Sequence, residues 1–331
     1  MQPKTTTLGD SDLQVSRMGL GLAALGRPGY INLGHGEDLA FNYVVEAMER
    51  RTHRMLDLAY ENGIRHFDAA RSYGRAEQFL QTWIQENGYD DAVVSSKWGY
   101  SYTADWKVET DIHEIKDHSL ENLQRQWEKS KVLLPYLKIY QIHSATFESG
   151  VFDKTEVLQH LAELRKEHGI LIGTTVSGPN QVALLQRAID LEVNGRRLFD
   201  TVQATYNILE QSTGPMLEEA AGRGIGVIIK EALANGRLTV RNDDPEFKIS
   251  KQRLEIIGRE YEVGMDAIAL AFVLSRPWVH SVLSGAAVAN HLLSNLDALN
   301  IELGTDAQRQ IAEMRQKPET YWSKRSALKW N

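Results

Sequence analysis

The stretch LKIYQIHSATFESGVFDKTEVLQHLAELRKEHGILIGTTVSG, residues 137–178, indicates the fold of this chain. It begins and ends with apolar runs that are typical of strands covered on both faces. Between them Val157, Leu161 and Leu164 recur at helical spacing, and Gly169 is a typical helix stop. A strand, a helix and a second strand in this order predict a parallel pair joined by a right-handed crossover.

The same alternation continues in both directions along the chain. Strands are expected at 17–25, 64–70, 92–99, 137–144, 170–178, 200–207, 226–233 and 280–287. Amphipathic helical patterns lie between them, and no proline- or glycine-rich linker divides the series. Eight such units predict an α/β chain folded as a closed (β/α)8 TIM barrel, which typically takes about 250 residues plus insertions. A doubly wound open sheet is the alternative architecture.

The 331 residues exceed what eight units require, and the extra segments have evident places. We expect an N-terminal hairpin at about 5–16, an insertion at 27–42, a polar loop at 237–248 and an aromatic C-terminal tail at 321–330. The insertion and the tail either wall a substrate cleft or pack on the barrel. The expected organisation is one barrel domain that spans residues 1–331.

Composition limits the classes of function. Hydrophobic residues make up 42% and charged residues 24% of the chain, which is ordinary for a globular protein. The net charge of −7 argues against general nucleic-acid or membrane-surface binding. The absence of cysteine excludes disulfides and thiolate metal sites. We expect a cytoplasmic protein with a small-molecule substrate and no nucleic-acid or membrane partner, and the sequence leaves its oligomeric state open.

Several motif-like segments lack the spacing that their chemistry requires. The segment GLGLAALG, residues 19–26, has Ala24 where the dinucleotide fingerprint needs its third glycine. In HEIKDH, residues 113–118, the histidines are five apart and would lie about 140° apart on a helix, so we expect a solvated helix face. His35 is a lone loop histidine without an expected metal role. No metal site, P-loop or nucleophile elbow is predicted.

Ionisable side chains follow three successive predicted strands, at the face where TIM barrels build their sites. Asp68 and Tyr73 follow the second strand, Lys97 ends the third and His143 ends the fourth. A neighbouring ammonium would lower the pKa of the phenol from its ordinary value near 10. Asp68 can pair with that ammonium, and His143 can donate to the oxygen that Tyr73 attends. This set fits a proton donor for carbonyl reduction.

Carbonyl reduction also needs a hydride, which no side chain supplies, so a nicotinamide cofactor is implied. Ser177 closes the fifth strand and Gln203 lies in the sixth, and both suit the nicotinamide amide. Two other functions stay open. One is a regulatory barrel that holds the cofactor and reports redox state with little turnover. The other is a lyase in which Lys97 forms a Schiff base, although Tyr73 and Asp68 then have no joint role.

The chain resembles the aldo/keto reductase family over nearly its whole length. The segments that carry the resemblance are, in order, 8–26, 67–77, 93–100, 140–144, 202–210 and 282–295. The resemblance implies a TIM barrel that reversibly reduces an aldehyde or ketone with NAD(P)H, or oxidises a sugar-like alcohol. It implies Tyr73 as general acid/base, with Lys97 as the modulator of its pKa. Asp68 is then the partner of the lysine, and His143 orients the substrate.

The resemblance also implies a set of cofactor contacts, namely Gly21, Ser177, Gln203, Lys230, Leu233, Arg237, Gly285, Asn290, His291 and Asn295. Three departures matter. Lys230 stands where the family often has a tyrosine under the nicotinamide, and Gly178 replaces the asparagine of a Ser-Asn pair. The segment 282–295 lacks the lysine or arginine common in members that prefer the 2′-phosphorylated cofactor. We therefore expect NADP only slightly ahead of NAD.

Overall fold

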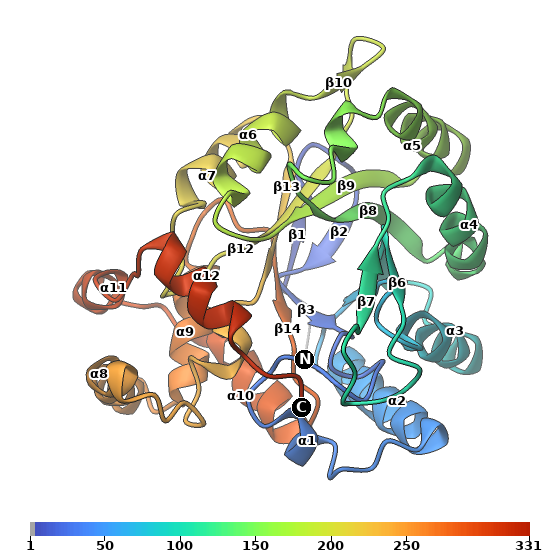
Figure 1. The fold of residues 1–331 in the computed structure, drawn as a ribbon. Coiled ribbons are helices and arrows are strands. Elements are labelled where there is room, and N and C mark those ends of the chain that lie inside the picture. The colour runs from blue at the N-terminus through green and yellow to red at the C-terminus, as the bar shows by residue number, and fades with distance from the viewer. Residues whose placement is uncertain (1–3) are drawn as a thin grey trace.

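The computed structural model describes residues 4–331 and has a closed barrel of eight parallel strands at its centre (Figure 1). In chain order the strands are β3 (Met18–Gly21), β4 (His66–Asp68), β5 (Val93–Trp98), β8 (Leu137–Ala145), β9 (Leu171–Val176), β12 (Thr201–Thr205), β13 (Gly226–Lys230) and β14 (Ser281–Ser284). Closure joins β14 to β3 and β12 to β9. The TIM barrel is confirmed, and the open sheet is excluded.

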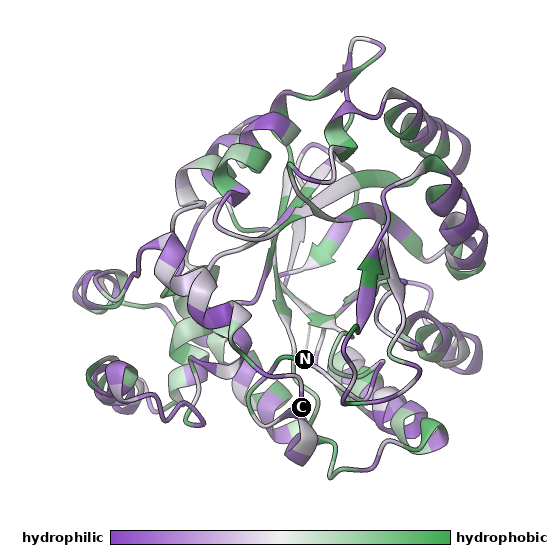
Figure 2. Cartoon of the chain, in the orientation of Figure 1, coloured by the Kyte–Doolittle hydropathy of each residue, from purple (hydrophilic) through white to green (hydrophobic). Residues whose placement is uncertain are grey.

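Helices surround the barrel, and most of them bury one face only. They are α1 (His35–Asp38), α2 (Val45–Glu61), α3 (Ala76–Asn87), α4 (Leu120–Ser130), α5 (Thr155–His168), α6 (Gln181–Asp190), α7 (Gly214–Gly222), α8 (Lys248–Glu260), α9 (Met265–Leu274), α10 (Ala289–Asp297), α11 (Thr305–Ala312) and α12 (Pro318–Ser326). Short 3-10 turns are η1 (Lys131–Leu133), η2 (Val151–Asp153), η3 (Ala234–Gly236), η4 (Pro245–Phe247) and η5 (Ala298–Asn300). Hydrophobic and hydrophilic residues alternate along many of these ribbons (Figure 2).

The predicted N-terminal hairpin is confirmed. It consists of β1 (Thr5–Thr7) and β2 (Gln14–Ser16), which pair antiparallel. Leu8 and Val15 of the hairpin are fully buried against Val93, Ile139 and Ile228 inside the barrel. Because Val93 begins its strand, this packing closes the amino-terminal end of the barrel and leaves the carboxyl-terminal end for the site.

The segment 113–118 is not the solvated helix face that its histidine spacing suggested. Glu114–Lys116 forms β7, which pairs antiparallel with β6 (Tyr100–Tyr102). His118 follows the strand and is buried, with its Nε2 2.9 Å from the carbonyl oxygen of His143. The strand forms because residues 100–102, distant in sequence, supply its hydrogen-bond partners. A second small hairpin, β10 (Glu192–Val193) with β11 (Arg196–Arg197), lies between α6 and β12.

The chain's last residues lie beside the insertion 27–42, as the C-terminal label beside α1 indicates (Figure 1). The backbones of Tyr30 and Asn331 exchange two hydrogen bonds of 3.2 and 3.1 Å. The side-chain oxygen of Asn331 also accepts from the backbone nitrogen of His35 at 2.8 Å. Insertion and tail therefore form one structure on the barrel. No helix within residues 4–331 is long and apolar enough to cross a membrane.

Candidate active site

Lys97 and Asp68 form a buried ion pair where β5 and β4 end. Their side chains are 1% and 3% exposed. The ammonium also donates to the carbonyl oxygen of Ala69 at 2.9 Å. The second carboxylate oxygen of Asp68 accepts from Ser95 at 2.6 Å and from Gln203 at 3.2 Å. The charge on each partner is thus compensated, as burial requires.

Tyr73 lies in the loop after β4, directly above this pair. The Lys97 ammonium is 4.8 Å from the centre of its ring. The ring of His143, from β8, meets the Tyr73 ring edge-on, with 5.5 Å between ring centres and an angle of 84°. Side chains from three strand ends therefore converge, and all four predicted catalytic residues lie together.

Burial decides the protonation of the two rings. Burial, and then the negative charge of Asp68, raises the pKa of Tyr73 well above its ordinary value. This direction is opposite to the lowering that we expected from Lys97, whose charge Asp68 largely neutralises. Burial also lowers the pKa of His143 well below its ordinary value, and the charge of Lys97 adds to that effect. At neutral pH the site therefore holds a phenol and a neutral imidazole.

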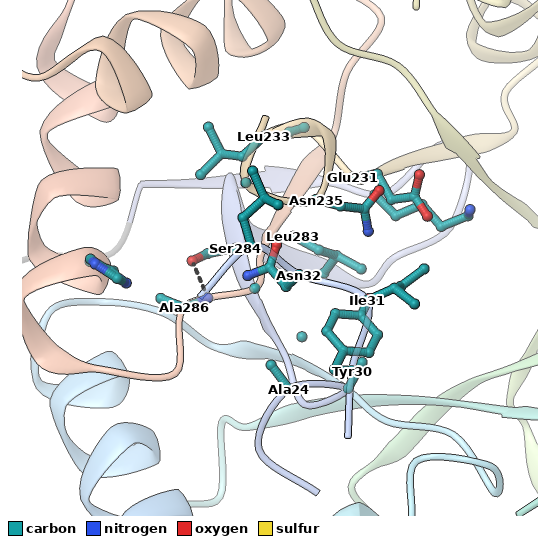
Figure 3. A pocket seen from close by; sticks show the side chains of 18 of the residues that line it. Ala24, Tyr30, Ile31, Asn32, Glu231, Leu233, Asn235, Leu283, Ser284 and Ala286 are labelled. Atoms are coloured by element: carbon teal, nitrogen blue, oxygen red, sulfur yellow. Dashed lines mark hydrogen bonds between the residues drawn. The ribbon is translucent and has the colours of Figure 1, made fainter. Parts of the chain in front are cut away.

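A cavity of about 410 Å³ opens beside this cluster. It extends from Tyr73 and His143 to Asp266 and Ser294, which belong to α9 and α10. Figure 3 shows side chains of the insertion facing those of the loop after β13 and of β14 across this space. Eight of the ten predicted cofactor contacts line it: Gly21, Ser177, Gln203, Lys230, Leu233, Gly285, His291 and Asn295.

The structure does not bring Arg237 or Asn290 to the cavity. The guanidinium of Arg237 lies 4.3 Å from the centre of the Tyr321 ring and donates to the Ala234 carbonyl oxygen at 2.9 Å. It therefore joins α12 to the segment after β13. Asn290 lies in the first turn of α10 and is exposed. Asn290 is exposed although its neighbour His291 lines the cavity, because successive residues of a helix face different directions.

Lys230 ends β13, lines the cavity and forms hydrogen bonds with two hydroxyl groups. Its ammonium donates to the hydroxyl oxygens of Ser177 at 2.7 Å and Thr205 at 3.1 Å. Burial lowers the pKa of Lys230 to about 8. Next to it, burial acts to raise the pKa of Glu231, but the charges of Arg325 and Lys230 outweigh burial and bring it to about 2. Glu231 and Arg325 form an ion pair of 2.8 Å.

Sequence reasoning missed the residues that close the cavity at the end where Tyr73 lies. The Arg27 guanidinium lies 5.3 Å from the Tyr73 ring centre and 4.8 Å from that of Trp330, and it pairs with Glu114 at 3.0 Å. Trp330 also stacks on the ring of His113, with 3.8 Å between ring centres. In the sequence, the only indication of these residues was the position of the insertion 27–42 and the aromatic content of the tail 321–330. Both segments wall the cavity.

The lining residues fit an elongated polar molecule such as a nicotinamide dinucleotide. The side-chain oxygen of Asn235 is buried in the wall without a hydrogen-bond partner, so it is available to a ligand. Hydroxyl and amide groups of Ser177 and Asn295 supply further donors and acceptors. Within residues 4–331, no group of three or more histidine, aspartate or glutamate side chains is placed to hold a metal ion.

Known proteins resemble this chain in sequence and in fold. A model of the aldo/keto reductase family matches residues 17–316. The uncharacterized oxidoreductase YqkF of Bacillus subtilis is 24% identical in an alignment 343 positions long, which covers 96% of this chain and 98% of that protein. The L-glyceraldehyde 3-phosphate reductase of Escherichia coli O157:H7 is 25% identical in an alignment 329 positions long, which covers 89% of each chain. An aldo-keto reductase of Bacillus halodurans, in its holo form, superposes with a TM-score of 0.73 at 20% identity and covers 96% of this chain and 97% of its own. The chain belongs to the aldo/keto reductase family of oxidoreductases.

Proposed function

We propose that this protein uses NADPH to reduce an aldehyde or ketone to an alcohol, with Tyr73 as the proton donor. The observation that carries the proposal is the cluster of Tyr73, Asp68 and His143 in the wall of the cavity, with Lys97 paired to Asp68 behind them. The raised pKa of Tyr73 keeps the phenol protonated, which the reduction direction requires. The reverse oxidation of an alcohol needs the phenolate, so it should proceed faster at high pH.

Each residue of the cluster has a distinct task. The bound nicotinamide supplies the hydride. Tyr73 donates its proton to the oxygen of the carbonyl group as that oxygen gains negative charge. The neutral imidazole of His143 donates a hydrogen bond to the same oxygen and orients it. Lys97 stabilises the phenolate left behind, and Asp68 holds Lys97 in place. The Lys97–Asp68 ion pair also disfavours the Schiff-base lyase, because that reaction needs a free, uncharged amine.

Cofactor contacts are proposed for the residues that line the cavity. Ser177 and Gln203 suit the amide of the nicotinamide, although Gln203 already donates one hydrogen bond to Asp68. Arg241 lines the far part and offers a positive charge to a 2′-phosphate, but Asp38 pairs with it at 2.9 Å. Because Asp38 neutralises part of the charge of Arg241, the attraction to a 2′-phosphate is weakened, and we expect the preference for NADP over NAD to be small.

Turnover of a panel of reactive aldehydes with NADPH tests the proposal, after tryptophan fluorescence has shown that the nucleotide binds. We expect Tyr73→Phe to lower kcat by about 10²–10⁴-fold, the usual contribution of a positioned proton donor. Tyr206→Phe is the matched control, because that ring packs on Phe272 and Trp278 away from the cavity. Nucleotide binding without turnover by the unmodified protein would favour the regulatory barrel instead.

A further inference from the structure

In the part of the chain that the structure describes, Lys230 has no carboxylate as a direct partner, although the charge of the nearby Glu231 acts on it. Its three-donor ammonium is bonded to two hydroxyl oxygens, those of Ser177 and Thr205, and both are neutral. The nearest carboxylates have partners of their own: Glu231 pairs with Arg325, and Asp68 with Lys97. Within residues 4–331, Lys230 forms no ion pair shorter than 4.0 Å.

This charge lies beside the reaction centre. Lys230 is paired with Thr205 in the register of β12 and β13, and both Lys230 and Ser177 line the cavity. The field of Lys230 also contributes, after burial and Lys97, to the lowered pKa of His143. The same ammonium therefore acts on the substrate-orienting imidazole and on the wall proposed to hold the nicotinamide.

The two redox states of the nicotinamide differ in charge at this place. The oxidised ring is a cation, whereas the reduced ring is neutral. A fixed cation that is buried in the wall of the site repels a second cation. An aromatic side chain would instead attract a cationic ring through its π face. A lysine and a tyrosine at position 230 should thus have opposite effects on the oxidised cofactor.

We propose that Lys230 determines the preference of the site for redox state, by weakening the binding of NADP⁺ relative to NADPH. This rests on the proposed function, because it requires the nicotinamide to bind beside Ser177. The enzyme would then take up NADPH in the presence of excess NADP⁺ and suffer little inhibition by its oxidised product. Lys230 acts on cofactor binding, and the proton transfer remains with Tyr73.

Equilibrium titrations with NADPH and NADP⁺ separately, followed by tryptophan fluorescence or calorimetry, test the proposal. The quantity of interest is the ratio of the Kd for NADP⁺ to the Kd for NADPH. We expect Lys230→Met to lower this ratio by tenfold or more, as a charge effect of one or more pKa units implies. Lys230→Tyr should lower it further, and Lys230→Arg should preserve it. Lys138→Met, at the start of β8 and outside the cavity, is the control.

An unchanged ratio in Lys230→Met, with both nucleotides still bound, would overturn this proposal and leave the proposed function intact. Failure of the unmodified protein to bind either nucleotide would instead overturn the proposed function. A second readout is the same ratio of Kd values measured from about pH 7 to about pH 9, a range that spans the Lys230 pKa of about 8. The ratio should fall as Lys230 loses its proton, and Lys230→Met should show no such fall. The other charged groups around Lys230 are Glu231, Arg325, Lys97 and Asp68.

Discussion

Replacing Lys97 by methionine should lower both the free energy of unfolding and the activity, and a second substitution should restore only the first. The substitution leaves the carboxylate of Asp68, whose side chain is 3% exposed, without its cation. Removing one partner of a buried ion pair costs about 3–5 kcal/mol in the free energy of unfolding. Ser95 and Gln203 still donate to the carboxylate, so we expect the lower part of this range, about 3 kcal/mol.

The double variant Asp68→Asn with Lys97→Met removes both charges and should recover at least half of that loss. Activity should not recover, because the phenolate of Tyr73 then lacks the ammonium 4.8 Å from its ring. In Lys97→Met, which keeps the negative charge of Asp68, alcohol oxidation should require a higher pH than in the unmodified protein. Urea denaturation measures the first effect, and pH profiles of kcat measure the second. A loss below about 1 kcal/mol in the single variant, or a double variant no more stable than it, would refute this reasoning.

Three further predictions concern the walls of the cavity. The pKa of Glu231 is about 2, below its ordinary value of 4.5, so its contribution to stability is complete above about pH 4.5 and is lost as the pH falls towards 2. Denaturation should therefore show that the stability difference between the unmodified protein and Glu231→Gln shrinks from pH 4.5 to pH 2. Arg241→Ala removes the 2.9 Å contact to Asp38, which joins the insertion to the segment after β13 beside the cavity. Stopped-flow measurements should show that NADPH is released about tenfold faster, the effect of losing about 1.4 kcal/mol of interaction. Trp330→Ala removes an aromatic wall beside Arg27 and should raise KM for aldehydes several-fold with little change in kcat; an unchanged KM would place the substrate elsewhere.

The barrel could be predicted because its determinants are local. Apolar runs such as 170–178 and helical spacing such as that of Val157 and Leu161 appear in the sequence as they appear in the structure. Segment 113–118 could not be predicted in this way, because its strand forms only against residues 100–102. The spacing of the two histidines indicated a helix, whereas pairing with residues 100–102 makes the segment a strand.

The candidate catalytic cluster could also be predicted, because barrel topology brings strand ends to one face whatever the loops do. The remainder of the site depends on tertiary contacts that no local pattern encodes. The pairing of Asn331 with Tyr30 joins segments about 300 residues apart and positions Trp330 over Arg27. The raised pKa of Tyr73 likewise reflects burial, which residue spacing does not report.

Single-turnover hydride transfer in Tyr73→Phe tests the central claim most directly. Enzyme saturated with NADPH is mixed rapidly with a reactive aldehyde, and the loss of reduced nicotinamide is followed by fluorescence. We predict a rate reduced by about 10²–10⁴-fold, with the Kd for NADPH unchanged from that of the unmodified protein. Hydride transfer at the unmodified rate would contradict the assignment of Tyr73, and with it the role given to the cluster beneath it.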